Sequence, residues 1–524
     1  MKIIKKSIFI VLIVTGLSAL FWGCSYENKK KTVEPIFTWY RDIPGVTSEE
    51  IDAINALCEQ TEYFVYGMPL SIEAFKNEDG EISGFSAMFC DWLTGLFGIP
   101  FKPAIYELQD LFSGLASGDI SFSGELTITE DRLKVFYMTS ALISRPVKYF
   151  RLEGAESLSD IAKERLVRCG FINGAATISA ILAELTPGTY EIVLLDDFSR
   201  VYDALTSGRI DAFYYSGTAE VNFINYSDVG TYNFYPLIRM PVSLATQNEA
   251  LIPVISVVEK ALQSGAARYL IEMYNKSFQD YTRHKLFSKF TDEELAYIEN
   301  SSVIPFSAEH DNYPTSFFDV HIKKWTGIGF DVLHEIADLT GLNFSIAHTP
   351  DTGISELVQM LDNGDSFLHI ELDRLTERNG RYLWPKSYFK IDNPALISQM
   401  DQRGIDIHEI YSVKVGLTKG ITYTEMFHKW FPNHNLITEY ESQNESFDAL
   451  MRGDVAMVMN SYSGLLYLTH YLERTGYKIN YLFDYPYYCT FGFNRDQEIL
   501  CSIIDKALGI IDTYRITNQW MTRT

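Results

Sequence analysis

The sequence predicts an α/β protein in which one unit of about 245 residues occurs twice. Two observations support this. Strand and helix patterns alternate along the chain, which is typical of sheets covered by helices on both faces. Landmarks also recur: the helix start Thr47-Ser-Glu-Glu50 reappears 244 residues later as Thr291-Asp-Glu-Glu294. Glycines that bound predicted helices recur at nearly the same distance, as the pairs Gly84 and Gly327, Gly98 and Gly341, Gly118 and Gly364, and Gly208 and Gly453.

The repeat divides the chain into four expected segments: an export signal at 1–24, a spacer at 25–46, and two folded units at 47–285 and 286–524. In the first unit, the hydrophobic periodicity predicts parallel strands alternating with helices. One long helix is expected to close each unit. The predicted ranges are strands 63–66, 101–106, 120–124, 168–172, 191–195 and 210–214, helices 87–97, 109–117, 176–184 and 198–207, and closing helices 250–274 and 498–520.

Composition narrows the function. The chain has 44 basic and 68 acidic residues, a formal net charge of −24, which repels nucleic acids and anionic lipid surfaces. We therefore expect no nucleic-acid partner. A hydrophobic content of 47% with only 17 prolines predicts that nearly all of the chain is folded.

The amino terminus predicts export from the cytoplasm. Three lysines precede an apolar run of 15 residues from Ile8 to Trp22, which is short for a membrane-spanning helix. Gly23-Cys24 follows and resembles a bacterial lipoprotein cleavage site, so Cys24 is the expected lipidated residue. An uncleaved membrane anchor and simple secretion are the alternatives. All three place the folded part outside the cytoplasm, and the first two tether it to the membrane.

Familiar catalytic and cofactor motifs are absent from the sequence. There is no GxSxG, HExxH, GxxxxGK[ST] or GxGxxG pattern, and the histidines are scattered. Five cysteines follow Cys24 without metal-type spacing, which favours free buried thiols. We expect no cofactor, no metal and no catalytic residue.

The stretch from Leu111 to Arg132 predicts a binding site. It reads as a helix, a buried strand and then a polar loop at the strand's carboxyl end, where open α/β sheets bind ligands. Arg132 can hold a carboxylate through two hydrogen bonds, and Thr127 can add a hydroxyl beside it. Further along, residues 172–177 form a strand, a turn and a helix start, whose free amides attract anions.

These motifs together resemble the family 3 extracellular solute-binding proteins, which have the type II periplasmic-binding fold. The matching stretches, in order along unit one, are Asp79-Gly80 with Gly84-Phe85, Leu111 to Asp119, Leu126 to Arg132, Gly170 to Gly174, and Ala204 to Ala212. The resemblance implies two tandem domains, each of two α/β lobes that close on a ligand about a double hinge.

The resemblance also implies roles for single residues. Thr127 and Arg132 would bind a ligand carboxylate, Phe75 would pack on its side chain, and Asn173 and Gly174 would contribute from the opposite lobe. Many relatives hold the ligand's ammonium group with an acid where this chain has Ser216. We therefore expect Glu125 to supply the missing negative charge; the alternative is that Glu125 points to solvent.

Unit two resembles the same family less closely. Its matching residues include Tyr313, Phe317, Glu371 and Arg378, but Asp373 stands where unit one has Thr127. We therefore expect unit one to keep the better-preserved site, with unit two binding something different or serving a structural role.

The expected function is the capture of a small polar solute, either amino-acid-like or a carboxylate, by a membrane-tethered binding protein outside the cell. It would serve an ABC-type permease or a membrane sensor partner. Tandem flytrap domains in which an FTxEE helix start precedes a domain, as Phe290 to Glu294 does here, also resemble the sensory ectodomains of histidine kinases and diguanylate cyclases. A dehydratase-type enzyme on the same fold, with Glu125 as its acid, is a minor alternative.

Overall fold

The computed structural model describes residues 35–77, 79–226, 228–372, 374 and 380–522. Contacts divide the chain into two compact units, one ending at Phe278 and the other starting at Gln279. They are called domain 1 and domain 2 below, and each is described by itself. The division falls inside helix α9 (Ala267–Phe287).

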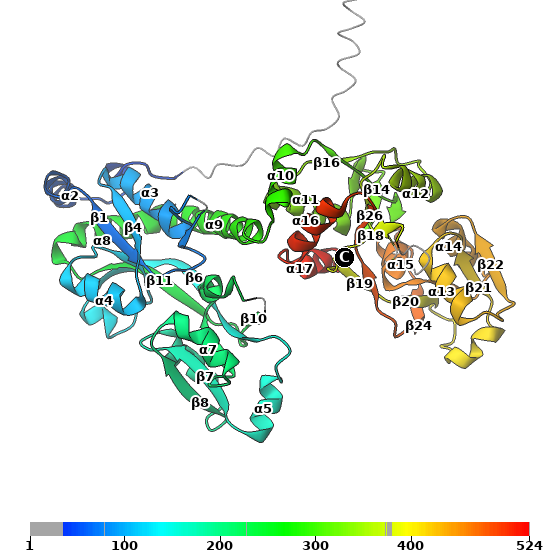
Figure 1. Ribbon diagram of the computed structural model, residues 1–524, viewed down its shortest axis with the longest axis horizontal. Helices are drawn as coiled ribbons and strands as arrows, with labels where there is room; N and C mark the ends of the chain where they lie inside the picture. Colours follow the sequence, from blue (N-terminus) through cyan, green and yellow to red (C-terminus); the bar gives the residue numbers. More distant parts are fainter. Residues whose placement is uncertain (1–34, 78, 227, 373, 375–379, 523–524) are drawn as a thin grey trace, which may run out of the picture. The chain divides into compact units, whose positions relative to one another are not determined.

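Domain 1 consists of two α/β lobes (Figure 1). In the first lobe, β1 (Phe64–Met68) pairs in parallel with β4 (Phe101–Ile105). In the second lobe, β7 (Val167–Ile172) pairs in parallel with β8 (Tyr190–Leu195) and β9 (Ala212–Ser216). The remaining elements are α2 (Ser48–Gln60), β2 (Phe75–Lys76), β3 (Ile82–Ser83), α3 (Phe85–Phe97), α4 (Leu108–Ser117), β5 (Ser123–Leu126), α5 (Leu158–Glu164), α6 (Thr177–Leu182), α7 (Val201–Thr206), β10 (Val229–Asn233) and α8 (Ile252–Ala261).

Two long strands connect the lobes of domain 1. Strand β6 (Tyr137–Leu152) pairs antiparallel with β11 (Arg239–Thr246) along its first part and with β9 and β10 along its second. The chain thus passes from the first lobe to the second along β6 and returns along β11, which forms a double hinge. The predicted parallel sheets are therefore mixed sheets, because the crossing strands run antiparallel to their neighbours.

Domain 2 repeats this plan. In the first lobe, β12 (Ile304–Ser307) lies between the parallel strands β16 (Phe344–Ile346) and β17 (Leu368–His369). In the second, β21 (Val415–Thr418) lies between the parallel strands β22 (Ile437–Tyr440) and β23 (Met457–Ser461), with α13 (Thr422–Trp430) and α14 (Gln443–Arg452) packed beside them (Figure 1). The crossing strands are β19 (Lys390–Asp392) and β25 (Tyr487–Cys489).

The other elements of domain 2 complete the two lobes around these strands. They are α10 (Asp292–Asn300), β13 (Asp311–Asn312), β14 (Ser316–Asp319), β15 (Lys324–Thr326), α11 (Ile328–Thr340), α12 (Ile354–Asn363), β18 (Tyr382–Leu383), β20 (Pro394–Gln399), α15 (Tyr462–Leu466), β24 (Tyr477–Leu482), β26 (Gly492–Asn494), α16 (Glu498–Leu508) and α17 (Thr513–Met521).

The repeated helix start has the same structural role in both domains. A threonine caps α2 and α10, and the glutamate three residues later completes a capping box. That glutamate also accepts hydrogen bonds of 2.6 Å from a serine and a lysine on the closing helix, which ties the first helix of the domain to the last part of the fold. The residues are Thr47, Glu50, Ser256 and Lys260 in domain 1 and Thr291, Glu294, Ser502 and Lys506 in domain 2.

The prediction that one long helix closes each domain was wrong, because two successive helices close each domain. In domain 1, Gly265 at φ 110° interrupts the helix between α8 and α9. In domain 2, α16 ends at Leu508, and Asp512 caps the separate helix α17 by accepting a hydrogen bond from the Arg515 amide. Glycine and a capping aspartate break the helical pattern in both cases.

The strand before the binding loop is also shifted. It was expected at 120–124, but β5 begins at Ser123, where pairing with β11 starts. Phe122 instead forms a single bridge with Tyr66 of β1. The predicted spacer needs correction too, because Tyr40 and Ile43 are buried in the core of the first lobe.

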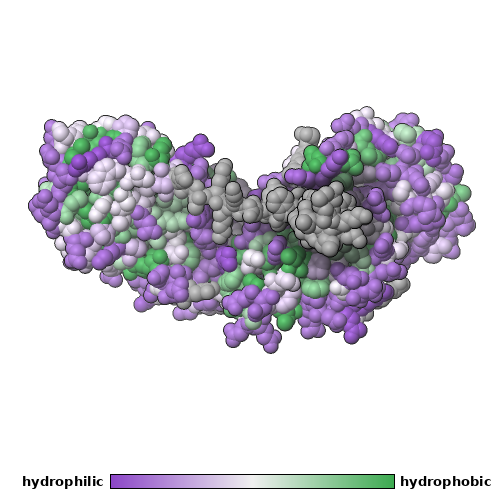
Figure 2. All heavy atoms as spheres, turned by 90° about the horizontal axis from the view of Figure 1, so that it is seen from above, coloured by the Kyte–Doolittle hydropathy of each residue, from purple (hydrophilic) through white to green (hydrophobic). Residues whose placement is uncertain are grey.

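The surface view in Figure 2 shows hydrophilic side chains spread over that face of the molecule, with small hydrophobic patches between them. The described cysteines are free, as expected, and four of them are buried; Cys58 is exposed. Among the described residues, the helical stretch 249–287 is long and apolar enough to cross a membrane. Its residues Val254, Val257 and Val258 lie in the core of domain 1, as in a core helix of a folded domain.

The two glycines that bound α11 offer a test of this fold. A Cβ at Gly327 (φ 134°) would lie 2.5 Å from the Thr315 carbonyl oxygen, whereas a Cβ at Gly341 (φ 83°) would meet nothing within 4 Å. We expect Gly327→Ala to lower the free energy of unfolding of domain 2 by about 3 kcal/mol or more, because it adds a backbone clash to the cost of the dihedral angle. Gly341→Ala carries only the dihedral cost, about 1–2 kcal/mol. Urea denaturation measures both, and equal losses would contradict the close approach.

Candidate functional site

A small cavity lies between the lobes of domain 1. Its volume is about 50 Å³. The residues around it come from both lobes and from the crossing strands: Leu108, Leu111, Phe112, Glu125, Leu126, Thr127, Arg132, Arg145, Gly174, Ala175, Ala176, Thr177, Tyr215, Ser216, Met240 and Val242. The structure therefore places five of the predicted site residues around one cavity: Glu125, Thr127, Arg132, Gly174 and Ser216.

Glu125 is held by an arginine that the sequence analysis missed. Arg145, on β6, donates to Glu125 at 2.7 and 3.0 Å and to Glu73 at 2.8 and 2.5 Å. All three side chains are buried. Burial raises the pKa of Glu73, whereas Glu125 and Glu73 hold the pKa of Arg145 above its ordinary value despite burial. Glu125 thus neither points to solvent nor carries an unpaired charge.

Arg132 also lines this cavity, but its contacts differ from those of Arg145. Its guanidinium donates to the Thr127 carbonyl at 3.0 Å and lies 5.5 Å from the centre of the Phe112 ring. Burial lowers its pKa below the ordinary value. Among the described residues, no acidic side chain pairs with it, so its charge is available to an anion.

The second lobe contributes the turn before α6. Gly174 has φ 78° and lines the cavity, whereas Asn173 is exposed and lies outside it. The Thr177 side chain is only 6% exposed, and its hydroxyl has no hydrogen-bond partner. Helix α6 has six residues, which is short for the anion-attracting helix start expected from the sequence. The orphaned hydroxyl is the stronger polar feature.

Two expected ligand residues play other roles in domain 1. Phe75 is 3% exposed and does not line the cavity. Ser216 lines it, but its hydroxyl lies 2.5 Å from that of Thr218. No acid therefore stands at the position where relatives hold an ammonium group.

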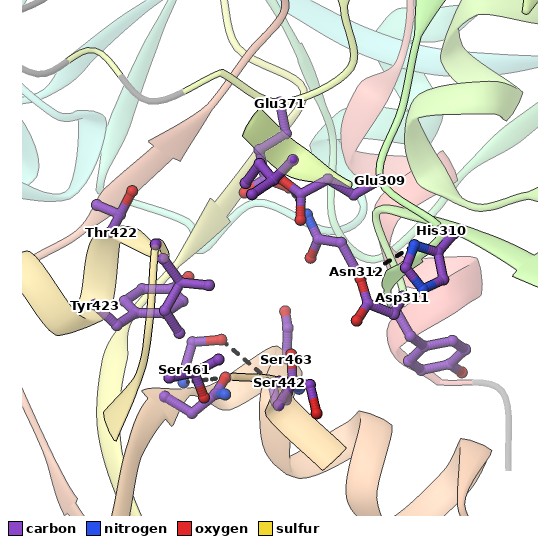
Figure 3. A pocket seen from close by; sticks show the side chains of 18 of the residues that line it. Glu309, His310, Asp311, Asn312, Glu371, Thr422, Tyr423, Ser442, Ser461 and Ser463 are labelled. Atoms are coloured by element: carbon purple, nitrogen blue, oxygen red, sulfur yellow. Dashed lines mark hydrogen bonds and ion pairs between the residues drawn. The ribbon is translucent and has the colours of Figure 1, made fainter. Parts of the chain in front are cut away.

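A much larger cavity, about 380 Å³, lies between the lobes of domain 2. This volume is within the range typical of small-molecule pockets. Figure 3 shows Glu309, Asp311, Asn312 and Glu371 of the first lobe around an open space that Thr422, Tyr423, Ser461 and Ser463 of the second lobe face. The more spacious cleft thus belongs to the domain that diverges more in sequence.

Lys390 takes the place in domain 2 that Arg145 has in domain 1. It lies on the first crossing strand, is 3% exposed, and donates to Thr315 at 2.8 Å and to Asp392 and Ser463 at 3.3 Å. Burial would lower its pKa, but nearby Cys489, Glu371 and Asp392 raise the pKa above the ordinary value. Thr315 here occupies the position of Glu73, because the carbonyl oxygen of each accepts a hydrogen bond from an amide in the first turn of the following helix.

In the described part of the chain, no arginine pairs with Glu371, the counterpart of Glu125. Glu371 lines the cavity, accepts a hydrogen bond from Asn312 at 3.1 Å and has φ 62°, a strained value for a residue with a Cβ. Asp311 lines the same wall, and its carboxylate lies 3.9 Å from Nδ1 of the neighbouring His310 ring.

The second lobe of domain 2 presents two buried polar atoms that have no partner. Thr422 is 7% exposed and Asn460 is 4% exposed, and neither the Thr422 hydroxyl nor the Asn460 side-chain amide nitrogen has a hydrogen-bond partner. Both residues line the cavity. Thr422 begins α13 as Thr177 begins α6, so each domain has an orphaned threonine hydroxyl at the same place. Such atoms cost free energy unless a ligand or water bonds them.

The remaining predicted site residues fall in three groups. Tyr313 lines the domain 2 cavity. Phe317 is buried beside it, with ring centres 5.0 Å apart, and is not part of the lining. Arg378 and Cys24 lie outside the described residues. In the described part of the chain, no cluster of three or more histidine, cysteine or acidic side chains could hold a metal ion.

Removal of Arg145 tests the buried ion pairs of domain 1. Arg145→Met should lower the free energy of unfolding by about 3–5 kcal/mol, because two buried carboxylates lose their counter-charge. Arg268→Met, which removes an exposed pair with Glu272, is the control and should leave the urea midpoint almost unchanged.

The pH dependence of this loss has a defined sign. Without Arg145, burial raises the carboxylate pKa values above those of the unfolded chain, so the stability is present at low pH and falls as the pH rises through the raised values. The destabilisation should therefore be larger at pH 8 than at pH 5. A loss independent of pH would show that packing rather than charge is responsible.

Comparisons with known proteins agree with this architecture. No family model matches the chain. The L-arginine-binding protein of Pseudomonas aeruginosa is 25% identical over 140 residues, which are 26% of this chain and 54% of that protein, so the chain spans about half the length of this curated relative.

Solved structures cover more of the chain. A structure described only as that of a VC protein matches with a TM-score of 0.54 at 15% identity, over 87% of this chain and all of that one. The periplasmic domain of BvgS from Bordetella pertussis matches over 90% of this chain and 92% of that one, at 16% identity and a TM-score of 0.42. The chain has the Venus-flytrap fold of type II periplasmic-binding proteins in two tandem copies and resembles the family 3 extracellular solute-binding proteins.

Proposed function

We propose that this chain is a non-enzymatic binding protein that captures a small polar solute between the lobes of domain 2. The observation that carries the proposal is the cavity of about 380 Å³, lined by two buried polar groups, Thr422 and Asn460, that have no hydrogen-bond partner in the described part of the chain. A bound solute with hydrogen-bonding groups would satisfy both.

The charges of this cavity favour a solute that carries an amino group. The described charged side chains around it are Glu309, Asp311, Glu371, Asp392 and Glu441, against Lys390 and Lys419. The two lysines pair with Asp392 and Glu441. Asp311 and Glu371 form no ion pair with a lysine or arginine in the described part of the chain, although Lys390 is near enough to Glu371 for the two charges to interact. Both acids face the open space (Figure 3). An amino-acid-like solute fits this wall, and the arginine-binding relative supports the same class.

Capture would take place outside the cytoplasm, with the chain tethered by the lipidated Cys24 or by an uncleaved anchor, as the sequence of the amino terminus suggests. Closure of the lobes about the crossing strands would be the output. An ABC-type importer or a membrane-bound sensor would read that output.

The sensory alternative has one specific observation in its favour. The FTxEE helix start of domain 2, Phe290 to Glu294, resembles that of sensory ectodomains and is tied to the closing helix through Glu294. Glu50 makes the equivalent tie in domain 1. The enzyme alternative loses its candidate acid, because both oxygens of Glu125 accept hydrogen bonds from Arg145.

Calorimetric titration of the mature chain tests this proposal. Arginine, lysine, glutamine and putrescine should include at least one solute that binds. Glu371→Gln should weaken its binding about tenfold, because a charge-assisted hydrogen bond is lost, and Thr422→Val should weaken it several-fold. Thr177→Val in domain 1 and Glu425→Gln on the exposed side of α13 are matched controls and should change little.

Two results would contradict the proposal. One is a solute whose binding is insensitive to Glu371→Gln and Thr422→Val but is lost in Thr177→Val, which would assign capture to domain 1. The other is the absence of binding by every solute of this panel.

A further inference from the structure

The domain 1 cavity differs from that of domain 2 in its charge balance. Three charged side chains line it: Glu125, Arg132 and Arg145. Arg145 holds both oxygens of Glu125, so these two charges compensate each other inside the fold. Arg132 is left over, with a backbone carbonyl and an aromatic ring as its contacts. The three lining charges sum to +1, and Glu73, which accepts from Arg145 behind the lining, brings the local sum to zero. Arg132 is still the arginine of this pair that has no carboxylate partner among the described residues.

A polar group on the opposite lobe completes an anion site. The Thr177 hydroxyl is buried, lines the same cavity and has no hydrogen-bond partner among the residues that the structure describes. A hydroxyl can donate to a carboxylate oxygen while Arg132 donates from the other side. The two donors come from different lobes, so an anion between them would favour the closed domain.

The same cavity has no place for an ammonium group. The Ser216 hydroxyl is engaged by Thr218, and the Glu125 carboxylate is engaged by Arg145. Burial of an ammonium ion beside Arg132 without a free carboxylate would carry a large desolvation cost. The apolar side chains that line the cavity, Leu108, Leu111, Leu126, Met240 and Val242, suit a short carbon skeleton instead.

The size of the cavity limits the skeleton. A volume of about 50 Å³ holds roughly three to five water-sized groups, taking about 10–15 Å³ for each. Acetate and glycolate have this size, whereas an amino acid with a long side chain is larger than the cavity in this arrangement of the lobes.

We propose that domain 1 binds a small monocarboxylate that carries no amino group, held by Arg132 and Thr177. The inference rests on the proposed function in treating the chain as a binding protein, but it assigns a second ligand class to the other domain. Arg132 thus selects the carboxylate, and the internal pair of Arg145 and Glu125 excludes the amine.

Glycolate and glycine make a matched pair of probes, since they differ only in a hydroxyl in place of the ammonium group. Each is titrated into the full mature chain by calorimetry, with acetate as a third probe. Glycolate or acetate should bind at least tenfold more tightly than glycine. Arg132→Gln should weaken that binding at least tenfold and Thr177→Val several-fold, with far-UV circular dichroism unchanged. Glu371→Gln in domain 2 should leave it unaltered.

A gain-of-function variant provides the most decisive test. Ser216→Asp adds a carboxylate where none is available, so glycine should bind this variant at least tenfold more tightly than the parent chain, and the preference for glycolate should fall. Glycine that binds the parent chain as tightly as glycolate, through Arg132, would overturn the inference, as would the absence of any glycolate and acetate binding. Neither result touches the binding of larger amines by domain 2, which is measured separately through Glu371 and Thr422.

Discussion

The charge balance of each cleft depends on one buried basic side chain on the first crossing strand. Arg145 and Lys390 occupy this place, 245 residues apart, and each is almost fully withdrawn from water. A buried cation is tolerated only with acceptors arranged around it, so the neighbours of this side chain are constrained in both domains. The identity of these neighbours determines which charged side chains in the cleft are left to interact with a ligand.

The two domains meet this constraint in different ways. In domain 1, two glutamates of the first lobe surround Arg145, and the cavity between the lobes shrinks to about 50 Å³. In domain 2, a threonine replaces one glutamate and Asp392 on the same strand pairs with Lys390, which leaves Glu371 directed into a cavity of about 380 Å³. Among the described residues, a duplicated scaffold thus presents an arginine without a carboxylate partner in one cleft and carboxylates without an ion-pair partner in the other.

Much of this architecture was predictable from the sequence, because it depends on local signals. The glycine pairs that bound α3 and α11 and the capping boxes at Thr47 and Thr291 repeat in the sequence and in the structure alike. The crossing strands were harder to predict, since β6 runs through both lobes and reads as one long apolar strand with interspersed basic residues. The repeat does contain a signal for Arg145, because a lysine stands at the equivalent position 390, but its partners come from distant segments.

The charges and free polar groups of each cleft were less predictable, again because they depend on contacts between segments that are distant in the sequence. Whether Glu125 carries an unpaired charge depends on a side chain 20 positions away on β6, which is separated from β5 by β11, and sequence spacing does not give side-chain direction. Likewise, the threonines at 177 and 422 look like ordinary helix starts in the sequence. Only the packing of the second lobe shows that their hydroxyls are buried without a partner. The motifs do not indicate the size of a cleft either, since the larger cleft lies in the domain whose motifs resemble the family less.

A crystal structure of the mature chain grown with an amine-bearing solute, such as arginine, would test the central claim most directly. The account predicts solute density in domain 2, with an ammonium or guanidinium nitrogen within hydrogen-bond distance of the Glu371 carboxylate and a polar group bonded to the Thr422 hydroxyl. It also predicts no amine in the domain 1 cavity. Solute density in domain 1, with its carboxylate on Arg132 and its amine on Glu125, would contradict the account.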